Sequence, residues 1–295
     1  MDKATIEAEL HALNQKYSEP WYHNYHFGHG IKSIPGQGPE DNFLIRSDII
    51  MELIYRFLEI RSPDEITACG RRLLDLGSAE GLQSIEAAMH GFDTVGIEGR
   101  ELFIERAEFA KKVFALGNVR FVHGDVRKIS EDTLGAFDVT LCLGILYHLD
   151  QEAMLPFFRA VSEMTSHLLI VDTHVDNPAS VVRYKLGDTS DIEGRYFGRM
   201  HFEHPEGLSI QQKLARVRAS LDNEKSFWFD YPSLCQILAD HGFNYVLEVK
   251  RPVHNMNADF RRTRVLLAAL KINKNDVVPR CYLSAKSILT MLSYD

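Results

Sequence analysis

The chain reads LLDLGSAEG over residues 73–81. The mainly apolar residues 73–76 predict a short buried strand, which ends in a Gly-containing turn, and a helix is expected over about residues 81–90. In a strand–turn–helix unit, backbone N–H groups and a helix N-terminus face a common crevice. The turn therefore predicts a ligand site at the carboxyl end of this strand.

Strands and helices alternate after this turn. This order predicts an α/β fold with a doubly wound, mostly parallel, Rossmann-like sheet of seven strands. Right-handed crossovers would bring the carboxyl ends of the parallel strands to one edge, where the ligand crevice lies. The further strands are expected at residues 94–97, 119–122, 139–143, 168–171, 243–249 and 264–270.

Three segments are expected along the chain. Residues 1–70 form an N-terminal helical arm or cap, and residues 71–272 form the α/β domain. Residues 176–228, which are polar and rich in aromatic residues and arginine, interrupt the alternation and predict a lid over the crevice. The tail, residues 273–295, has an apolar rhythm that would cover either the core or a partner, as in a homodimer.

Composition excludes several classes of protein. The 295 residues carry 33 basic and 41 acidic side chains, and the net charge of −8 argues against a generally basic nucleic-acid coat. No apolar run reaches the roughly 18 residues of a membrane span. The first residues lack an apolar signal core, and the four cysteines are widely spaced without a CxxC pair. We therefore expect a cytoplasmic protein with reduced thiols.

Acidic residues mark the ends of three successive strands: Asp75, Glu98 and Asp125. A dinucleotide loop would read GxGxxG, whereas this turn reads DxGxxxG. A carboxylate at the strand end repels phosphate, and an acid after the second strand can bind ribose hydroxyls. The pattern predicts a nucleoside ligand without phosphate and disfavours NAD. The alternative is that the glycines are simple turn residues and the acids only solubilise the strand ends.

These residues resemble the class I S-adenosylmethionine-dependent methyltransferases, most clearly over residues 71–173. The resemblance implies that the Gly-rich loop holds the methionine part of S-adenosylmethionine and that the second acid binds ribose. It also implies that the third acid lies beside adenine. Ala79 replaces the usual middle glycine, which is tolerable where the backbone does not need a positive φ. The implied cofactor-binding residues are Asp75, Gly77, Ser78, Gly81, Glu98, Asp125, Val126 and Leu143.

The fourth strand leads into Gly144-Ile145-Leu146-Tyr147-His148. Tyr147 and His148 are therefore expected beside the methyl group, with His148 as the first candidate for a general base and His174, after the fifth strand, as the second. Both histidines could instead be core residues hydrogen-bonded to the backbone. The Gly-x-Leu-Tyr-His phrase resembles the methyltransferase branch that modifies wobble uridine in tRNA, whose members transfer a carboxymethyl group and use basic side chains to hold its carboxylate.

Aromatic, histidine and arginine side chains outside the sheet are candidates for binding the acceptor. Stacked rings can recognise planar or cationic groups, and arginine can hold a carboxylate or phosphate bidentately. The alternatives are packing of the N-terminal arm and a solvated lid surface; the histidine spacing lacks a further ligand cluster, so no metal site is expected. The substrate candidates are Trp21, Tyr22, His26, His29, Arg195, Arg199 and Trp228.

The sequence thus predicts an enzyme that transfers a methyl group from S-adenosylmethionine to an O or N atom of a small molecule. Two alternatives remain open at this stage. One is an RNA-modifying enzyme of the wobble-uridine type, with nucleic acid as its partner. The other is a protein that binds S-adenosylmethionine without catalysis.

Overall fold

A seven-stranded sheet forms the centre of the computed structural model, which describes residues 1–36, 42–250 and 262–272. The strand order is β3-β2-β1-β4-β5-β10-β9, and β10 alone runs antiparallel to its neighbours. The predicted α/β class and mostly parallel sheet are confirmed. The strands are β1 (Arg72–Leu76), β2 (Asp93–Glu98), β3 (Val119–His123), β4 (Phe137–Leu143), β5 (Thr165–His174), β9 (Tyr245–Glu248) and β10 (Arg264–Leu270).

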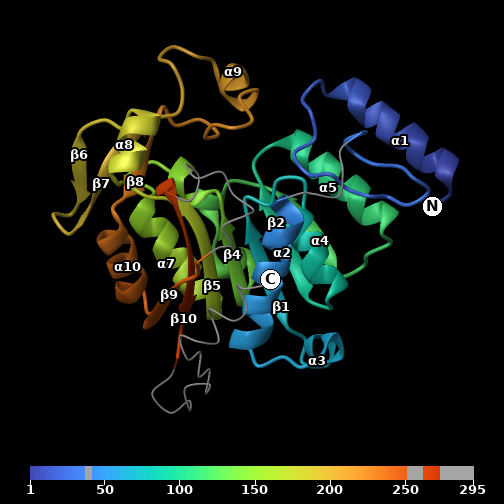
Figure 1. Cartoon of the computed structure of the whole chain (residues 1–295), viewed down its shortest axis with the longest axis horizontal. Helices are drawn as coiled ribbons and strands as arrows, with labels where there is room; N and C mark the ends of the chain where they lie inside the picture. The colour runs from blue at the N-terminus through green and yellow to red at the C-terminus, as the bar shows by residue number, and fades with distance from the viewer. Residues whose placement is uncertain (37–41, 251–261, 273–295) are drawn as a thin grey trace, which may run out of the picture.

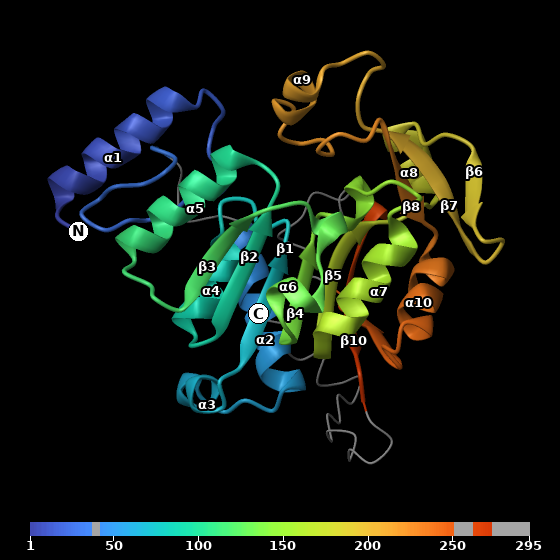
Figure 2. The ribbon, with the colours of Figure 1, turned by 180° about the vertical axis from the view of Figure 1, so that it is seen from behind.

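Helices cover both faces of the sheet. One face packs against α2 (Asn42–Phe57), α4 (Leu82–Met89) and α5 (Glu101–Val113), and α2 lies in front of the sheet in Figure 1. The opposite face packs against α6 (Glu131–Leu134), α7 (Met154–Met164) and α10 (Tyr231–Asp240), as the reverse view in Figure 2 shows. The remaining early helices are α1 (Lys3–Lys16) and α3 (Pro63–Ala68).

The chain reverses its direction of winding at β1, which lies between β2 and β4. At such a switch point the connections leave the carboxyl edge of the sheet to opposite sides and open a crevice there. The Gly-rich turn follows β1 at this edge. The topology therefore places the Gly-rich turn at the switch point of the sheet.

The N-terminal arm is held against α5 by a buried ion pair. Arg106 Nη1 lies 2.8 Å from Glu80 Oε1, and both side chains are fully buried. The Glu80 carboxylate also accepts hydrogen bonds from the backbone N–H groups of Tyr22 and His23. Because one fully satisfied carboxylate joins the arm, the turn and α5, the position of residues 22–23 beside the turn is fixed.

Residues 176–228 contain more regular structure than the sequence indicates. They include α8 (Pro178–Tyr184), β6 (Thr189–Ile192), β7 (Tyr196–Phe202) and α9 (Ile210–Leu214), and β8 (Lys225–Phe229) follows at their end. The three strands form a separate antiparallel sheet in the order β6-β7-β8. In Figures 1 and 2, α9 and the segment after it lie above the carboxyl edge of the central sheet.

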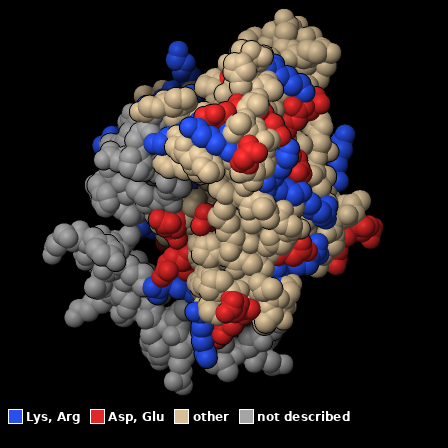
Figure 3. All heavy atoms as spheres, turned by 90° about the vertical axis from the view of Figure 1, so that its right-hand side faces the viewer, with Lys and Arg blue, Asp and Glu red and all other residues tan. Residues whose placement is uncertain are grey.

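The surface on the α1 side carries both signs of charge. On the face shown in Figure 3, Lys and Arg side chains alternate with Asp and Glu side chains. Among the described residues, no helix has the length and apolarity needed to cross a membrane. The tail, residues 273–295, lies outside the described residues, and Cys281 lies within it. The expectation that the tail covers either the core or a partner therefore also falls outside the described residues.

Candidate active site

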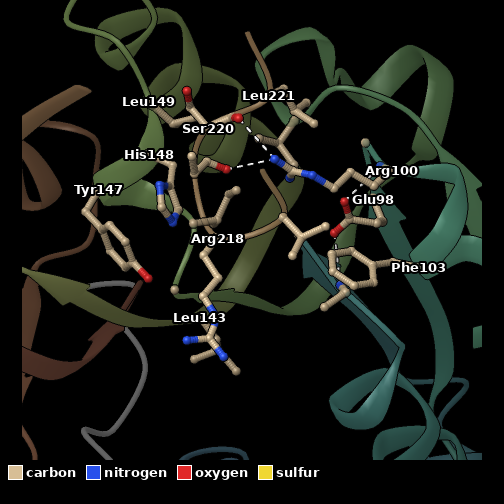
Figure 4. A pocket seen from close by; sticks show the side chains of 18 of the residues that line it. Glu98, Arg100, Phe103, Leu143, Tyr147, His148, Leu149, Arg218, Ser220 and Leu221 are labelled. Carbon is tan, nitrogen blue, oxygen red and sulfur yellow. Dashed lines mark hydrogen bonds between the residues drawn. The ribbon is translucent and has the colours of Figure 1, made fainter. Parts of the chain in front are cut away.

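A cavity of about 380 Å³ lies at the carboxyl ends of β1, β2, β3 and β4. This volume falls within the range of small-molecule sites in proteins. Residues of the N-terminal arm and of the segment between α9 and β8 also line the cavity, and Figure 4 labels Arg218, Ser220 and Leu221 of that segment. Its lining includes Tyr22, His23, Arg46, Gly77, Ala79, Glu98, Arg100, Phe103, Asp125, Val126, Leu143, Gly144, Tyr147, His148, Arg218, Asn223 and Arg264.

The Gly-rich turn forms the floor of the cavity with backbone rather than large side chains. Gly77 and Gly81 both have positive φ, at 66° and 82°, and Gly81 caps the N-terminus of α4. A Cβ on Gly81 would lie 2.6 Å from the Phe121 ring, so close packing also requires glycine there. Ala79 adopts φ 48°, a left-handed conformation, so the condition under which alanine is readily tolerated at this position is not met.

Glu98 is the acid that best fits a polar ligand contact. Its carboxylate accepts the backbone N–H groups of Ala79 at 3.0 Å and Arg100 at 2.9 Å, and the residue lines the cavity. Burial raises the pKa of Glu98, although the Arg100 side chain and these N–H donors oppose that shift. The carboxylate therefore joins the end of β2 to the Gly-rich turn and is held in place before any ligand arrives.

The other two acids have different surroundings. Asp75 is buried beneath the turn, accepts a hydrogen bond from Ser84 Oγ at 2.7 Å, and does not line the cavity. Burial raises its pKa to about 6. Asp125 does line the cavity, where it caps the 3₁₀ turn Val126–Lys128 and pairs with the Arg127 guanidinium at 2.7 Å. Ser78 is buried, and neither it nor Gly81 is among the lining residues.

His148 forms a dyad with a carboxylate that the sequence analysis did not single out. Its Nδ1 lies 2.9 Å from Oε1 of Glu203. His148 lines the cavity, and this contact does not involve its second ring nitrogen, Nε2. Glu203 is itself buried and accepts hydrogen bonds from Ser226 Oγ and Ser220 N. Burial alone would raise the pKa of Glu203, but the His148 contact and these donors lower it overall.

A carboxylate on Nδ1 orients the ring and favours the tautomer with the proton on Nδ1. Nε2 then carries the lone pair and can accept a proton from an acceptor group in the cavity. The backbone carbonyl of His148 also accepts a hydrogen bond from Asn223 Nδ2 at 3.0 Å. The histidine is thus held from two sides, as a positioned general base requires.

Tyr147 lines the cavity, but His174 and Trp228 lie behind it. The Trp228 indole donates to the Tyr147 carbonyl at 2.9 Å, and its ring stacks on His174 with centroids 4.7 Å apart. Burial, reinforced by the nearby Arg264, lowers the pKa of His174 to about 3. So weak a base that does not line the cavity is a packing residue, and the structure does not place His174 or Trp228 where a base or substrate contact would be.

Two arginines meet one buried carboxylate beside Tyr147. Arg264 Nε lies 3.0 Å from Oδ1 of Asp172, and Arg46 Nη2 lies 3.1 Å from Oδ2. Arg264 also donates to the Tyr147 hydroxyl at 3.3 Å. The Arg264 side chain is only 6% exposed. Both arginines line the cavity.

The guanidinium of Arg100 holds the segment after α9 over the cavity. It donates to four backbone carbonyls, and Figure 4 shows it reaching from the end of β2 toward this segment. Arg100 follows Glu98 by two residues and its backbone N–H donates to that carboxylate, so the segment after α9 and the acid share one anchor. The accepting carbonyls belong to Leu214, Arg216, Ala219 and Ser220.

Several substrate candidates lie away from this cavity. Trp21 is buried in the aromatic cluster between the arm and α5, where its indole donates to Asn14, and His26 and His29 are exposed on the arm. Arg195 pairs with Asp240, and Arg199 pairs with Asp176. Their ion pairs and positions on the small sheet explain why neither reaches the cavity. Of the arm residues proposed, Tyr22 lines it.

Sequence reasoning missed Glu203, Arg100 and Arg218. Glu203 lies 55 residues beyond its partner His148, so no local spacing links the two. Arg100 carries a usable signal, because it stands two residues after the acid at a strand end. Arg218 lies within the lid segment that the composition had indicated as rich in arginine. In the described ranges, no group of three or more metal-ligating side chains comes together.

Residues 69–192 match a family model described as a methyltransferase domain. Among solved structures, the N-terminal domain of EvdMO1 with SAH and D-fucose is 23% identical with a TM-score of 0.65, covering 92% of this chain and 98% of that one. The same domain with SAH alone gives the same values. In the complete EvdMO1, at 22% identity and a TM-score of 0.53, the match covers 48% of that chain. No curated protein sequence matches.

Residues 69–192 thus match a methyltransferase domain, and the strand order and the Gly-rich turn agree with the fold of the class I S-adenosylmethionine-dependent methyltransferases. The chain is therefore an enzyme of the transferase class. The similarity to EvdMO1 is a similarity of fold.

Proposed function

We propose that the protein transfers a methyl group from S-adenosylmethionine to an oxygen or nitrogen atom of a small molecule, with His148 as the general base. The observation that carries this proposal is the His148–Glu203 dyad in a cavity that also contains the Gly-rich turn. A hydroxyl or ammonium acceptor must lose a proton as it attacks, and a positioned histidine supplies that step. The EvdMO1 domain, crystallised with SAH and D-fucose, supports a hydroxyl acceptor.

The residues of the cavity fit the cofactor. The turn offers backbone N–H groups and only one methyl side chain, at Ala79, where the methionine part would lie. Glu98 has a carboxylate fixed by two N–H donors, and it would hold the ribose hydroxyls. Val126 and Leu143 provide apolar surface for the base, with Asp125 beside it. Asp75 and Ser78 would support the turn from below rather than contact the ligand.

Bound S-adenosylmethionine would supply a methyl group already activated on a sulfonium. The task of the protein is then to place the acceptor in line, exclude water and remove one proton. Orientation of the reactants can contribute about 7–11 kcal/mol in favourable cases. The Arg100-anchored segment would exclude water, and Glu203 would stabilise the protonated His148 after the proton has moved.

The test is a screen of small-molecule pools for formation of S-adenosylhomocysteine, with wild type and His148→Gln compared. The proposal predicts acceptor-dependent product with wild type and a loss of about 10²- to 10⁴-fold with His148→Gln. Cofactor binding without product from any pool would favour the non-catalytic alternative.

Cys69, Cys142 and Cys235 are free thiols, which supports the further proposal of a cytoplasmic enzyme.

One observation favours a second candidate, RNA modification by a carboxymethyl-bearing cofactor. Arg46 and Arg264 both line the cavity beside Tyr147, where they could hold an additional carboxylate. Their shared partner Asp172 already neutralises part of that charge, which favours the simple methyl donor. The RNA candidate predicts turnover of tRNA with the carboxylated cofactor and binding that weakens steeply with salt.

A further inference from the structure

A second cavity, of about 880 Å³, adjoins the first. The two share four lining residues, so the same segment after α9 borders both. The second cavity reaches from the N-terminal arm to the end of β7, where Glu203 lies. The shared residues are Tyr22, Val217, Arg218 and Ala219.

The arginines around the two cavities fall into two groups. Arg46, Arg127 and Arg264 each pair with at least one carboxylate, and Arg100 is satisfied by backbone carbonyls. Arg216 and Arg218 differ: in the part of the chain that the structure describes, neither guanidinium forms an ion pair with a carboxylate.

The two unpaired guanidinium groups have weak protein contacts. Arg216 donates to the Glu203 carbonyl at 3.4 Å, and Arg218 lies over the Tyr22 ring at 5.5 Å from its centroid. Both residues are exposed. In Figure 4, Arg218 and His148 lie on one side of the first cavity, across from Glu98 and Phe103. An anion bound by these arginines would therefore belong to the acceptor side of the site.

The rest of the second cavity suits an organic molecule rather than an ion alone. Trp21, Tyr22 and Phe202 contribute ring surface to its walls. The Nδ1 atom of His201 is buried and has no hydrogen-bond partner within the described residues. Aromatic walls with a few polar groups are typical of small-molecule sites.

We propose that the acceptor is a small molecule with an anionic group, phosphate or carboxylate, which Arg216 and Arg218 bind in the second cavity while its reacting group lies at His148. This inference rests on the proposed methyl transfer. Guanidinium groups bind both anions in bidentate fashion, and such charge-assisted contacts are stronger than neutral ones. Aromatic rings and only two guanidinium groups without ion pairs among the described lining residues favour a small molecule over an RNA backbone, which would need an extended positively charged surface.

The experiment is calorimetric titration of S-adenosylhomocysteine-loaded protein with inorganic pyrophosphate, succinate and neutral glycerol. Arg216→Gln and Arg218→Gln are compared with Arg195→Gln, whose guanidinium pairs with Asp240 outside both cavities. The backbone of the segment stays anchored in the variants, because Arg100 binds its carbonyls and not its side chains. Melting temperatures of the variants check that each one is folded.

We expect one anion, pyrophosphate or succinate, to bind while glycerol does not, and this result identifies the anionic group as phosphate or carboxylate. Each cavity variant should weaken that binding by about tenfold or more, and Arg195→Gln should leave it unchanged. Binding of neither anion, or equal binding by all variants, would overturn the inference. Bulk tRNA is titrated in the same way. If it binds more tightly than either small anion and with the same dependence on both arginines, the inference that the acceptor is a small molecule is overturned. If S-adenosylhomocysteine did not bind to the protein at all, the proposed function itself would be rejected.

Discussion

Nδ1 of His148 lies 2.9 Å from Oε1 of Glu203, which joins the turn after β4 to the end of β7. The carboxylate is buried, and it accepts two further hydrogen bonds from Ser226 and Ser220. A side chain with so many partners cannot swing away from the imidazole without leaving donors unsatisfied. The residue that directly follows β7 of the small sheet therefore supplies the group that orients the candidate base.

Substitution of Glu203 tests this positioning role. Glu203→Gln should lower kcat by about tenfold or more while it leaves cofactor affinity unchanged, since the base loses its charged partner and tautomer control. Glu224→Gln, an exposed neighbour in the same segment, is the matched control and should behave as wild type.

Burial of Asp75 predicts a pH-dependent stability. Its pKa is raised to about 6 by burial, above the usual value for an aspartate in an unfolded chain. The folded state therefore holds this proton more tightly, and the contribution to stability is lost as the pH rises from about 4 to about 6. Relative to Asp75→Asn, wild type should lose up to about 3 kcal/mol of unfolding free energy across that window. Urea unfolding at several pH values measures the difference, and parallel curves would contradict the prediction.

The buried His174 imidazole predicts the opposite dependence of the unfolding free energy on pH. Burial and Arg264 lower its pKa to about 3, so the unfolded chain takes up the proton first as the pH falls. Its contribution to stability is therefore present above about pH 6.5 and is lost as the pH falls toward 3. His174→Phe retains ring surface against Trp228 and should flatten this acid-side loss in the same urea experiments. An unchanged acid-side slope would show that the imidazole accepts a proton in the folded state.

Backbone strain at Ala79 predicts a stabilising glycine. Ala79→Gly should raise the free energy of unfolding by about 0.5–1 kcal/mol, because glycine adopts a positive φ without the steric cost. The same substitution at Ala8, exposed within α1, should instead lower stability by about 1 kcal/mol. Thermal unfolding of both variants provides the comparison, and destabilisation by Ala79→Gly would contradict the conformation described for the turn.

Removal of the Arg100 guanidinium should loosen the lid. Arg100→Gln leaves carbonyls of the segment after α9 without their shared donor. Amide hydrogen exchange over residues 214–221 should accelerate by about tenfold or more, and cofactor should dissociate faster. Arg56→Gln, which removes the i,i+4 pair with Glu52 on α2, is the control. Unchanged exchange in Arg100→Gln would show that other contacts hold the segment.

The sequence predicts the central sheet well because its signals are local. Apolar runs and turn residues mark β1 to β5, and the acids at the ends of β2 and β3 both line the cavity. The small sheet is less predictable, since Phe197 and Phe202 on β7 are apolar but exposed. The alternation of buried apolar and exposed polar residues that identifies a strand is therefore not clear there. The dyad and the lid anchor depend on contacts between residues 55 or more than 110 positions apart, which no spacing rule reveals.

Trp21 illustrates the same limit for the substrate candidates. Its neighbourhood of aromatic and histidine residues suits either a binding loop or a packed arm, and sequence alone offers no criterion between them. The decisive group is Arg106, whose guanidinium lies 4.8 Å from the Trp21 ring and pairs with Glu80. Beside that ion pair the tryptophan packs in the arm cluster and borders only the second cavity, whereas Tyr22, the next residue, lines both cavities.

Calorimetric titration of S-adenosylmethionine into cofactor-stripped wild type, Glu98→Gln and Glu101→Gln tests the central claim most directly. Glu101, exposed in the first turn of α5, is the matched control. We predict one-to-one binding to wild type and to Glu101→Gln, and binding weaker by about 10- to 100-fold in Glu98→Gln. Absence of binding to wild type, or equal binding by Glu98→Gln, would contradict the assignment of this cavity to the cofactor.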